Sequence, residues 1–183
     1  MNSLQGHLLV ASPHLLDPNF VRTVVLLIQH THEGAFGVVL NRPTDSTVQD
    51  IWSQVGEGDC QDRQHVNLGG PVSGPLLALH DNLALSELEV LPGVYFAAQR
   101  ENLEKLVGEL DHAYRLFVGH SGWGGGQLER ELEEGSWFTL PASAEYVFYD
   151  GGDLWKRVSQ AIGRSFLTSA LKIKHVPPDP AAN

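Results

Sequence analysis

The chain has 183 residues, of which 42% are hydrophobic and 19% are charged, a composition typical of one globular domain. Asp and Glu number 22 against 12 Lys and Arg, which gives a net charge of −10. Because DNA binding draws much of its affinity from basic residues that displace counterions, this charge disfavours direct nucleic-acid binding.

The sequence predicts a cytoplasmic protein without membrane attachment. Its longest apolar run, Val24 to Ile28, is too short for a membrane helix, and its first residues do not have the pattern of a secretory signal. Cys60 is the single cysteine, so no internal disulfide can form, as is usual in a reducing compartment.

Short apolar and β-branched runs alternate with turn residues along the chain. They predict strands at 8–12, 22–30, 35–41, 66–68, 76–80, 94–98, 114–118 and 137–140. Apolar residues at helical spacing predict helices at 48–55, 103–110, 127–134 and 154–162. This order favours a mainly antiparallel or mixed sheet in one α+β domain over 1–171, followed by a frayed, proline-rich tail at 172–183.

A glycine-rich segment at 119–126 lies between a predicted strand and a predicted helix, as phosphate-binding loops do. No Lys-Ser or Lys-Thr pair follows the glycines, and Gln127 stands where a dinucleotide-binding loop has its third glycine. Trp123 likewise replaces the last glycine of a nucleophile elbow. We therefore predict a tight turn that packs Trp123 into a corner, with no cofactor.

The nine histidines raise the question of a metal site. His30 and His32 would share one face of a strand, but two ligands do not make a zinc site. We predict solvent-facing loop histidines and no metal. His80 or His120 beside the glycine-rich segment remains an alternative as the base of an enzyme.

Polar residues gather at the predicted strand ends, around Asp17, Asn41 and Arg42. Pro43 restrains the backbone of Arg42 and so holds its guanidinium at a defined place. Two interpretations stay open, an ion pair between Arg42 and Asp17 that locks two turns, and capture of a ligand.

Several long motifs resemble the AlgH/YqgE-like family of bacterial proteins. They lie at 8–20 (LLVASPHLLDPNF), 34–43 (GAFGVVLNRP), 68–80, 122–137 and 154–163, in the expected order over nearly the whole chain. The resemblance implies a single α+β or α/β domain with a barrel-like, strongly curved sheet flanked by helices. It also implies a label, regulation of the transcription of alginate genes, without assigned catalytic residues.

We therefore expect a non-catalytic regulatory or binding protein that acts through a protein or small-molecule partner. The alternatives are a histidine-dependent enzyme and a direct DNA-binding regulator. The candidate binding surface consists of Asp17, Asn19, Asn41, Arg42, Gly69, Gly70, His80, His120, Trp123 and Gln127.

Overall fold

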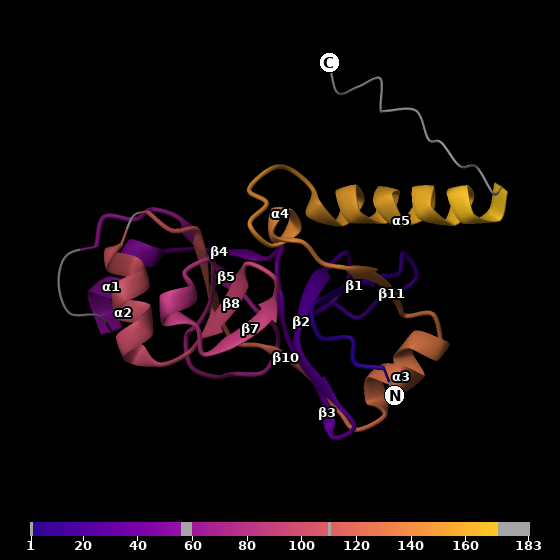
Figure 1. The fold of residues 1–183 in the computed structure, drawn as a ribbon, viewed down its shortest axis with the longest axis horizontal. Coiled ribbons are helices and arrows are strands. Elements are labelled where there is room, and N and C mark those ends of the chain that lie inside the picture. Colours follow the sequence, from indigo (N-terminus) through magenta and orange to yellow (C-terminus); the bar gives the residue numbers. More distant parts are fainter. Residues whose placement is uncertain (1, 56–59, 110, 172–183) are drawn as a thin grey trace, which may run out of the picture.

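The computed structural model describes residues 2–55, 60–109 and 111–171, and its strands form two sheets (Figure 1). The first sheet is antiparallel, with the order β10-β3-β2-β1-β11. It contains β1 (His7–Ala11), β2 (Val24–Thr31), β3 (Gly34–Val39), β10 (Ser121–Gly124) and β11 (Trp137–Pro141).

The second sheet is mixed, with the order β4-β5-β9-β6-β8-β7 and one parallel pair, β5 with β9. It contains β4 (Pro43–Thr47), β5 (His65–Leu68), β6 (Leu77–His80), β7 (Leu88–Leu91), β8 (Val94–Ala97) and β9 (Tyr114–Val118). The helices are α1 (Val48–Val55), α2 (Arg100–Gly108), α3 (Gln127–Glu133), α4 (Ala144–Val147) and α5 (Leu154–Leu171), with a 3₁₀ turn at Leu83–Leu85.

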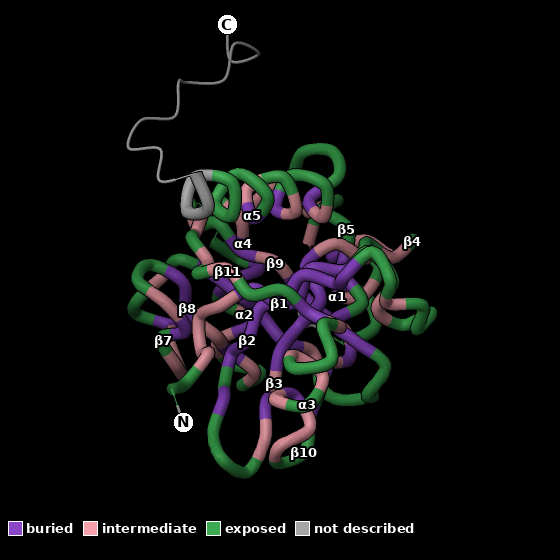
Figure 2. Tube along the Cα trace, turned by 90° about the vertical axis from the view of Figure 1, so that its right-hand side faces the viewer, coloured by how far each residue is buried: buried purple, intermediate pink, exposed green. Residues whose placement is uncertain are grey.

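The two sheets pack against each other around the main core. Alternate residues of β2 point to opposite sides, so that Leu26 lies in this core and Leu27 in a second cluster beneath α3. Burial on both faces explains why β2 is a continuous apolar run. Helices α1 and α2 cover the outer face of the second sheet, and α5 lies across the end formed by β1 and β11 (Figure 1). Figure 2 shows the buried strands inside and α5 at the surface, with much of its length exposed.

The predicted α+β class with antiparallel pairs is confirmed, and β2 and β3 form an antiparallel hairpin. The expected barrel-like sheet is instead a pair of separate sheets. Thr47 caps α1, because its Oγ1 accepts from the amide of Asp50 while Asp50 Oδ2 accepts from the amide of Thr47. Helix α5 continues well past the predicted end at 162. The predicted tail at 172–183 lies outside the described residues.

Three strands and one helix were not predicted, β4, β7, β10 and α4. The tight turn expected in the glycine-rich segment is wrong, because residues 121–124 form an edge strand, β10, that pairs with β3. Trp123 is nevertheless packed, with 6% of its surface exposed. Among the described residues no helix is both long and apolar enough to cross a membrane.

Candidate functional site

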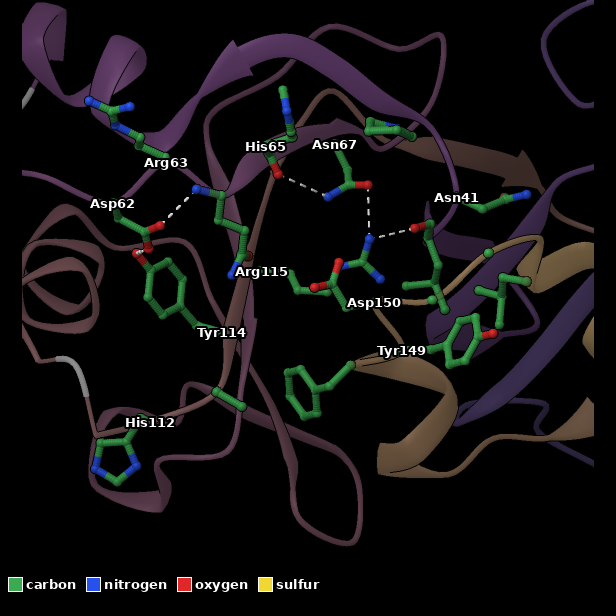
Figure 3. Close-up of a pocket in the computed structure, with 18 residues that line it drawn as sticks. Asn41, Asp62, Arg63, His65, Asn67, His112, Tyr114, Arg115, Tyr149 and Asp150 are labelled. Atoms are coloured by element: carbon green, nitrogen blue, oxygen red, sulfur yellow. Dashed lines mark hydrogen bonds between the residues drawn. The ribbon is translucent and has the colours of Figure 1, made fainter. Parts of the chain in front are cut away.

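A cleft of about 840 Å³ opens where β4, β5 and β9 meet the segment that joins α4 to α5 (Figure 3). Its volume falls in the range of small-molecule sites. The walls are mixed: Leu40, Pro43 and Phe148 contribute apolar surface, and most of the other lining side chains are polar. The crossover from β3 to β4 places Leu40 and Pro43 there, since this crossover carries the chain from the first sheet to the second.

Arg115 of β9 is the polar centre of this cleft (Figure 3). Its Nη2 donates to the carbonyl oxygen of Leu40 at 2.6 Å and to Oδ1 of Asn67 at 2.9 Å, and its Nη1 donates to the carbonyl oxygen of Val147 at 2.9 Å. The guanidinium therefore joins the β3–β4 crossover, β5 and the end of α4. These bonds fix its position.

Within the described residues, the charge of Arg115 has no directly bonded counterion. The guanidinium forms no ion pair with any residue that the structure describes, and burial lowers the pKa of Arg115 to about 10, with the nearby charge of Asp150 opposing that shift. A guanidinium has five N–H donors, and three of them are used. The Nε–H and one Nη1–H have no acceptor within the described part of the chain.

Tyr114 and Asp62 form a second polar pair in the cleft. The Tyr114 hydroxyl donates to Oδ2 of Asp62, and Oδ1 of Asp62 accepts from the amide of Gln64 at 2.8 Å. Burial, aided by the Asp62 carboxylate, raises the pKa of Tyr114 far above its usual range. Both oxygens of Asp62 are thus engaged within the protein, and Tyr114 stays protonated as a donor.

Of the ten residues predicted for a binding surface, Asn41 is the one that lines the cleft. Its Oδ1 accepts from the amide of Val24 and its Nδ2 donates to the carbonyl oxygen of Arg22, each at 2.9 Å. Its side-chain amide is therefore already committed to the turn before β2.

The ion pair between Arg42 and Asp17, one of the two interpretations that the sequence left open, is not formed. Arg42 Nη2 instead donates to the carbonyl oxygen of Val21 at 2.7 Å, while Oδ1 of Asp17 accepts from the amide of Asn19 at 2.8 Å. The turn before β2 and the turn after β3 are thus held together by a hydrogen bond from a guanidinium to a backbone carbonyl oxygen. A carboxylate is not required, because the exposed turn at 17–21 presents its own acceptors.

Gly69 and Gly70 meet the segment that contains Gly119 and His120. A methyl group at Gly69 would overlap the carbonyl oxygen of Gly119, and Gly70 has a φ of +153°, which disfavours other residues. Ser121 Oγ donates to the carbonyl oxygen of Gly69 at 3.0 Å. These glycines permit a close backbone approach. The ring of His120 lies against Phe36, with centroids 5.1 Å apart.

Trp123 and Gln127 belong to a network around Glu131 of α3. Oε2 of Glu131 accepts from the indole nitrogens of Trp123 and Trp137, and its Oε1 accepts from Nε2 of Gln127 at 2.9 Å. Phe20 packs on both indole rings. This arrangement holds α3 against the first sheet.

The prediction of solvent-facing loop histidines holds for His32, which is exposed in a turn, and is wrong for His30 and His80, which are buried in strands. His30 is 5% exposed, its Nδ1 accepts from the amide of Leu4 at 2.9 Å, and its Nε2 donates to Glu129 at 3.0 Å. His80 is fully buried, and neither of its ring nitrogens has a hydrogen-bond partner among the residues described. Throughout 2–55, 60–109 and 111–171, no three His, Cys, Asp or Glu side chains are grouped to hold a metal ion.

Sequence reasoning missed Arg115, Asn67 and Asp150. One signal was present, because Arg115 interrupts the apolar run of 114–118 and a charged residue in a buried strand needs a partner. The partners come from segments up to 75 residues away in sequence, which no local pattern indicates.

The profile of the AlgH-like family (DUF179) matches residues 8–167. A UPF0301 protein of Chlorobaculum tepidum is 38% identical over 88% of each chain, and one of Stenotrophomonas maltophilia is 44% identical over 80% of this chain and 81% of its own. The solution structure of the AlgH protein from Pseudomonas aeruginosa superposes with a TM-score of 0.74 at 27% identity, covering 97% of both chains. A crystal structure from Corynebacterium diphtheriae gives 0.72 at 25% identity, over 88% of this chain and 87% of its own.

Proposed function

We propose that this chain, which belongs to the AlgH-like family, is a non-catalytic binding protein whose cleft takes a small molecule with an anionic group at Arg115. The observation that carries the proposal is the half-buried guanidinium with two unused N–H donors and no ion pair within the described residues. A carboxylate or phosphate oxygen is the acceptor that such donors bind most strongly.

The two polar groups beside Arg115 are not arranged as a catalytic pair, although His65 and His112 also line the cleft. Tyr114 stays protonated, and Asp62 is engaged on both oxygens. The two histidines that the sequence offered as bases, His80 and His120, do not line the cleft. The histidines that do line it each have Nδ1 engaged, His65 with the carbonyl oxygen of Thr44 and His112 with Asp81. We propose a regulatory role in the cytoplasm through this small-molecule partner, ahead of direct DNA contact, because the net charge of −10 opposes approach to the densely charged backbone of DNA.

The test is a titration of the ¹⁵N-labelled protein with acetate, inorganic phosphate and 3-phenylpropanoate, followed by NMR. We expect the amide signals of Asn67, Arg115 and Tyr149 to shift in a saturable way. Arg115→Lys keeps the charge but loses the planar fork, and should weaken binding about tenfold or more. Lys105→Gln is the matched control, because Lys105 is exposed on α2 and lies outside the cleft.

The wild-type titration keeps the proposal testable even where a variant at Arg115 fails to fold. Unchanged cleft signals with all three anions would contradict it. So would an equal loss of binding in Lys105→Gln, which would indicate general attraction to positive charge.

A further inference from the structure

A second charged group lies in the cleft beside Arg115. Asp150 belongs to the segment between α4 and α5, and Figure 3 shows its carboxylate next to the guanidinium. The two side chains are close enough for the charge of Asp150 to act on Arg115, yet they form no ion pair. Arg115 therefore keeps unused N–H donors and Asp150 keeps unused carboxylate acceptors, and both residues line the cleft.

Arg115 cannot move into contact with Asp150 without losing hydrogen bonds that it already makes. Three hydrogen bonds from its Nη1 and Nη2 hold it against Leu40, Asn67 and Val147. Asp150 is exposed, and no described residue donates a hydrogen bond to its carboxylate. The cleft thus offers a fixed cationic donor and a free anionic acceptor side by side.

A simple anion fits this pair poorly. It would satisfy the unused N–H donors of Arg115, but it would also place a second negative charge near Asp150 in a protein of net charge −10. Asp62 is no alternative acceptor for a cation, because Tyr114 and Gln64 already occupy its oxygens. A molecule that carries both charges close together satisfies both groups.

We propose that the ligand is an α-amino acid bound as a zwitterion, with its carboxylate on Arg115 and its ammonium group on Asp150. This inference rests on the proposed function and names its ligand class. The volume of about 840 Å³ exceeds what the head group fills, so the amino-acid side chain extends along the apolar wall of Phe148 and Leu154.

The experiment compares matched probes on the full-length protein by NMR titration. The common L-amino acids are screened first, with L-phenylalanine compared in every case with 3-phenylpropanoate, which lacks the ammonium group, and 2-phenylethylamine, which lacks the carboxylate. The amino acid should bind about tenfold more tightly than either analogue, since a hydrogen bond to a charged group is worth about that factor.

Asp150→Asn removes the negative charge of the pair and leaves Arg115 in place. Because Asp150 is exposed, this variant should fold. We expect it to reduce the affinity for L-phenylalanine to that for 3-phenylpropanoate, and to leave 3-phenylpropanoate binding equal or slightly tighter. Asp45→Asn, at an exposed position outside the cleft, is the control that changes the net charge equally.

The outcomes distinguish this inference from the function on which it rests. If 3-phenylpropanoate binds as tightly as every amino acid tested, the zwitterion is wrong and the anion site stands. If the amine alone binds as tightly as the amino acid, Arg115 is not the anchor and the inference fails. If no amino acid and no anion shifts the cleft signals, both proposals fall.

Discussion

Oε2 of Glu131 lies 2.8 Å from the indole nitrogen of Trp137, and the same oxygen accepts from Trp123 at 2.9 Å. One carboxylate thus satisfies two buried indoles. Glu131→Ala leaves both N–H groups without this acceptor and should lower the free energy of unfolding by about 2 kcal/mol or more. Glu131→Gln retains one oxygen and should lose about half as much. Urea unfolding measures both.

Glu133→Ala is the matched control, since Glu133 is exposed on the same helix and should change stability by less than about 0.5 kcal/mol. A loss in Glu131→Ala no larger than that of the control would show that the two indoles do not depend on Glu131.

Gly69 lies where two backbone segments cross. A methyl group there overlaps the carbonyl oxygen of Gly119, so Gly69→Ala should lower the free energy of unfolding by about 2 kcal/mol or more. Gly122 has open space around its Cα, and Gly122→Ala should change stability by less than about 1 kcal/mol. Thermal or urea unfolding compares the two, and equal losses would contradict the close approach.

The sequence predicted the strands and helices that have a distinctive local pattern of apolar residues. It did not predict those that depend on pairing with distant segments. Strand β2 was predictable because burial on both faces requires an unbroken apolar run. Strand β10 was missed because Gly122 and Gly124 have no side chains to reveal its alternation, and its partner β3 lies some 85 residues earlier.

The candidate site shows the same division. The sequence placed Asn41 and Arg42 in a candidate binding surface, whereas in the structure both side chains bond to the backbone of the turn before β2. Arg115 was passed over because its acceptors, Leu40 and Val147, are backbone carbonyls from distant segments. A backbone carbonyl is present at every position, so no residue type in the sequence marks it as a partner.

Asn41 reproduces the hydrogen bonding of a strand with its side chain. Asn41→Asp keeps the acceptor for the amide of Val24 but turns a carboxylate oxygen toward the carbonyl oxygen of Arg22. We expect a loss of about 1–3 kcal/mol and faster hydrogen exchange at Val24. In Asn19→Asp, where the exposed side chain makes neither bond, exchange at Val24 should not change. Unaltered exchange in both variants would contradict this role.

His80 makes stability depend on pH. Burial holds the pKa of His80 below its usual range, partly opposed by the carboxylates of Asp81 and Glu87, while the charge of His112 adds to the lowering. The unfolded chain therefore takes up this proton first. The contribution of His80 to stability is complete above the unfolded pKa of about 6.5 and declines as the pH falls below it, by at most about 1.4 kcal/mol per pH unit.

The measurement is urea unfolding of the wild type and His80→Leu at several pH values on both sides of that pKa. The difference between them isolates His80 from the other titrating groups. It should be constant at high pH and shift in favour of His80→Leu as the pH falls. A difference that does not vary with pH would show that the ring is not held neutral by burial.

The positions of the aromatic residues decide which optical signal can report on the cleft. None of the four tryptophans lines it, and two of them share Glu131 on the far side of the first sheet. Two of the four tyrosines, Tyr114 and Tyr149, do line it. Binding of a ligand in the cleft should therefore change the tryptophan fluorescence very little and should instead change the near-ultraviolet circular dichroism of the tyrosines. An assay based on tryptophan emission would overlook such a ligand.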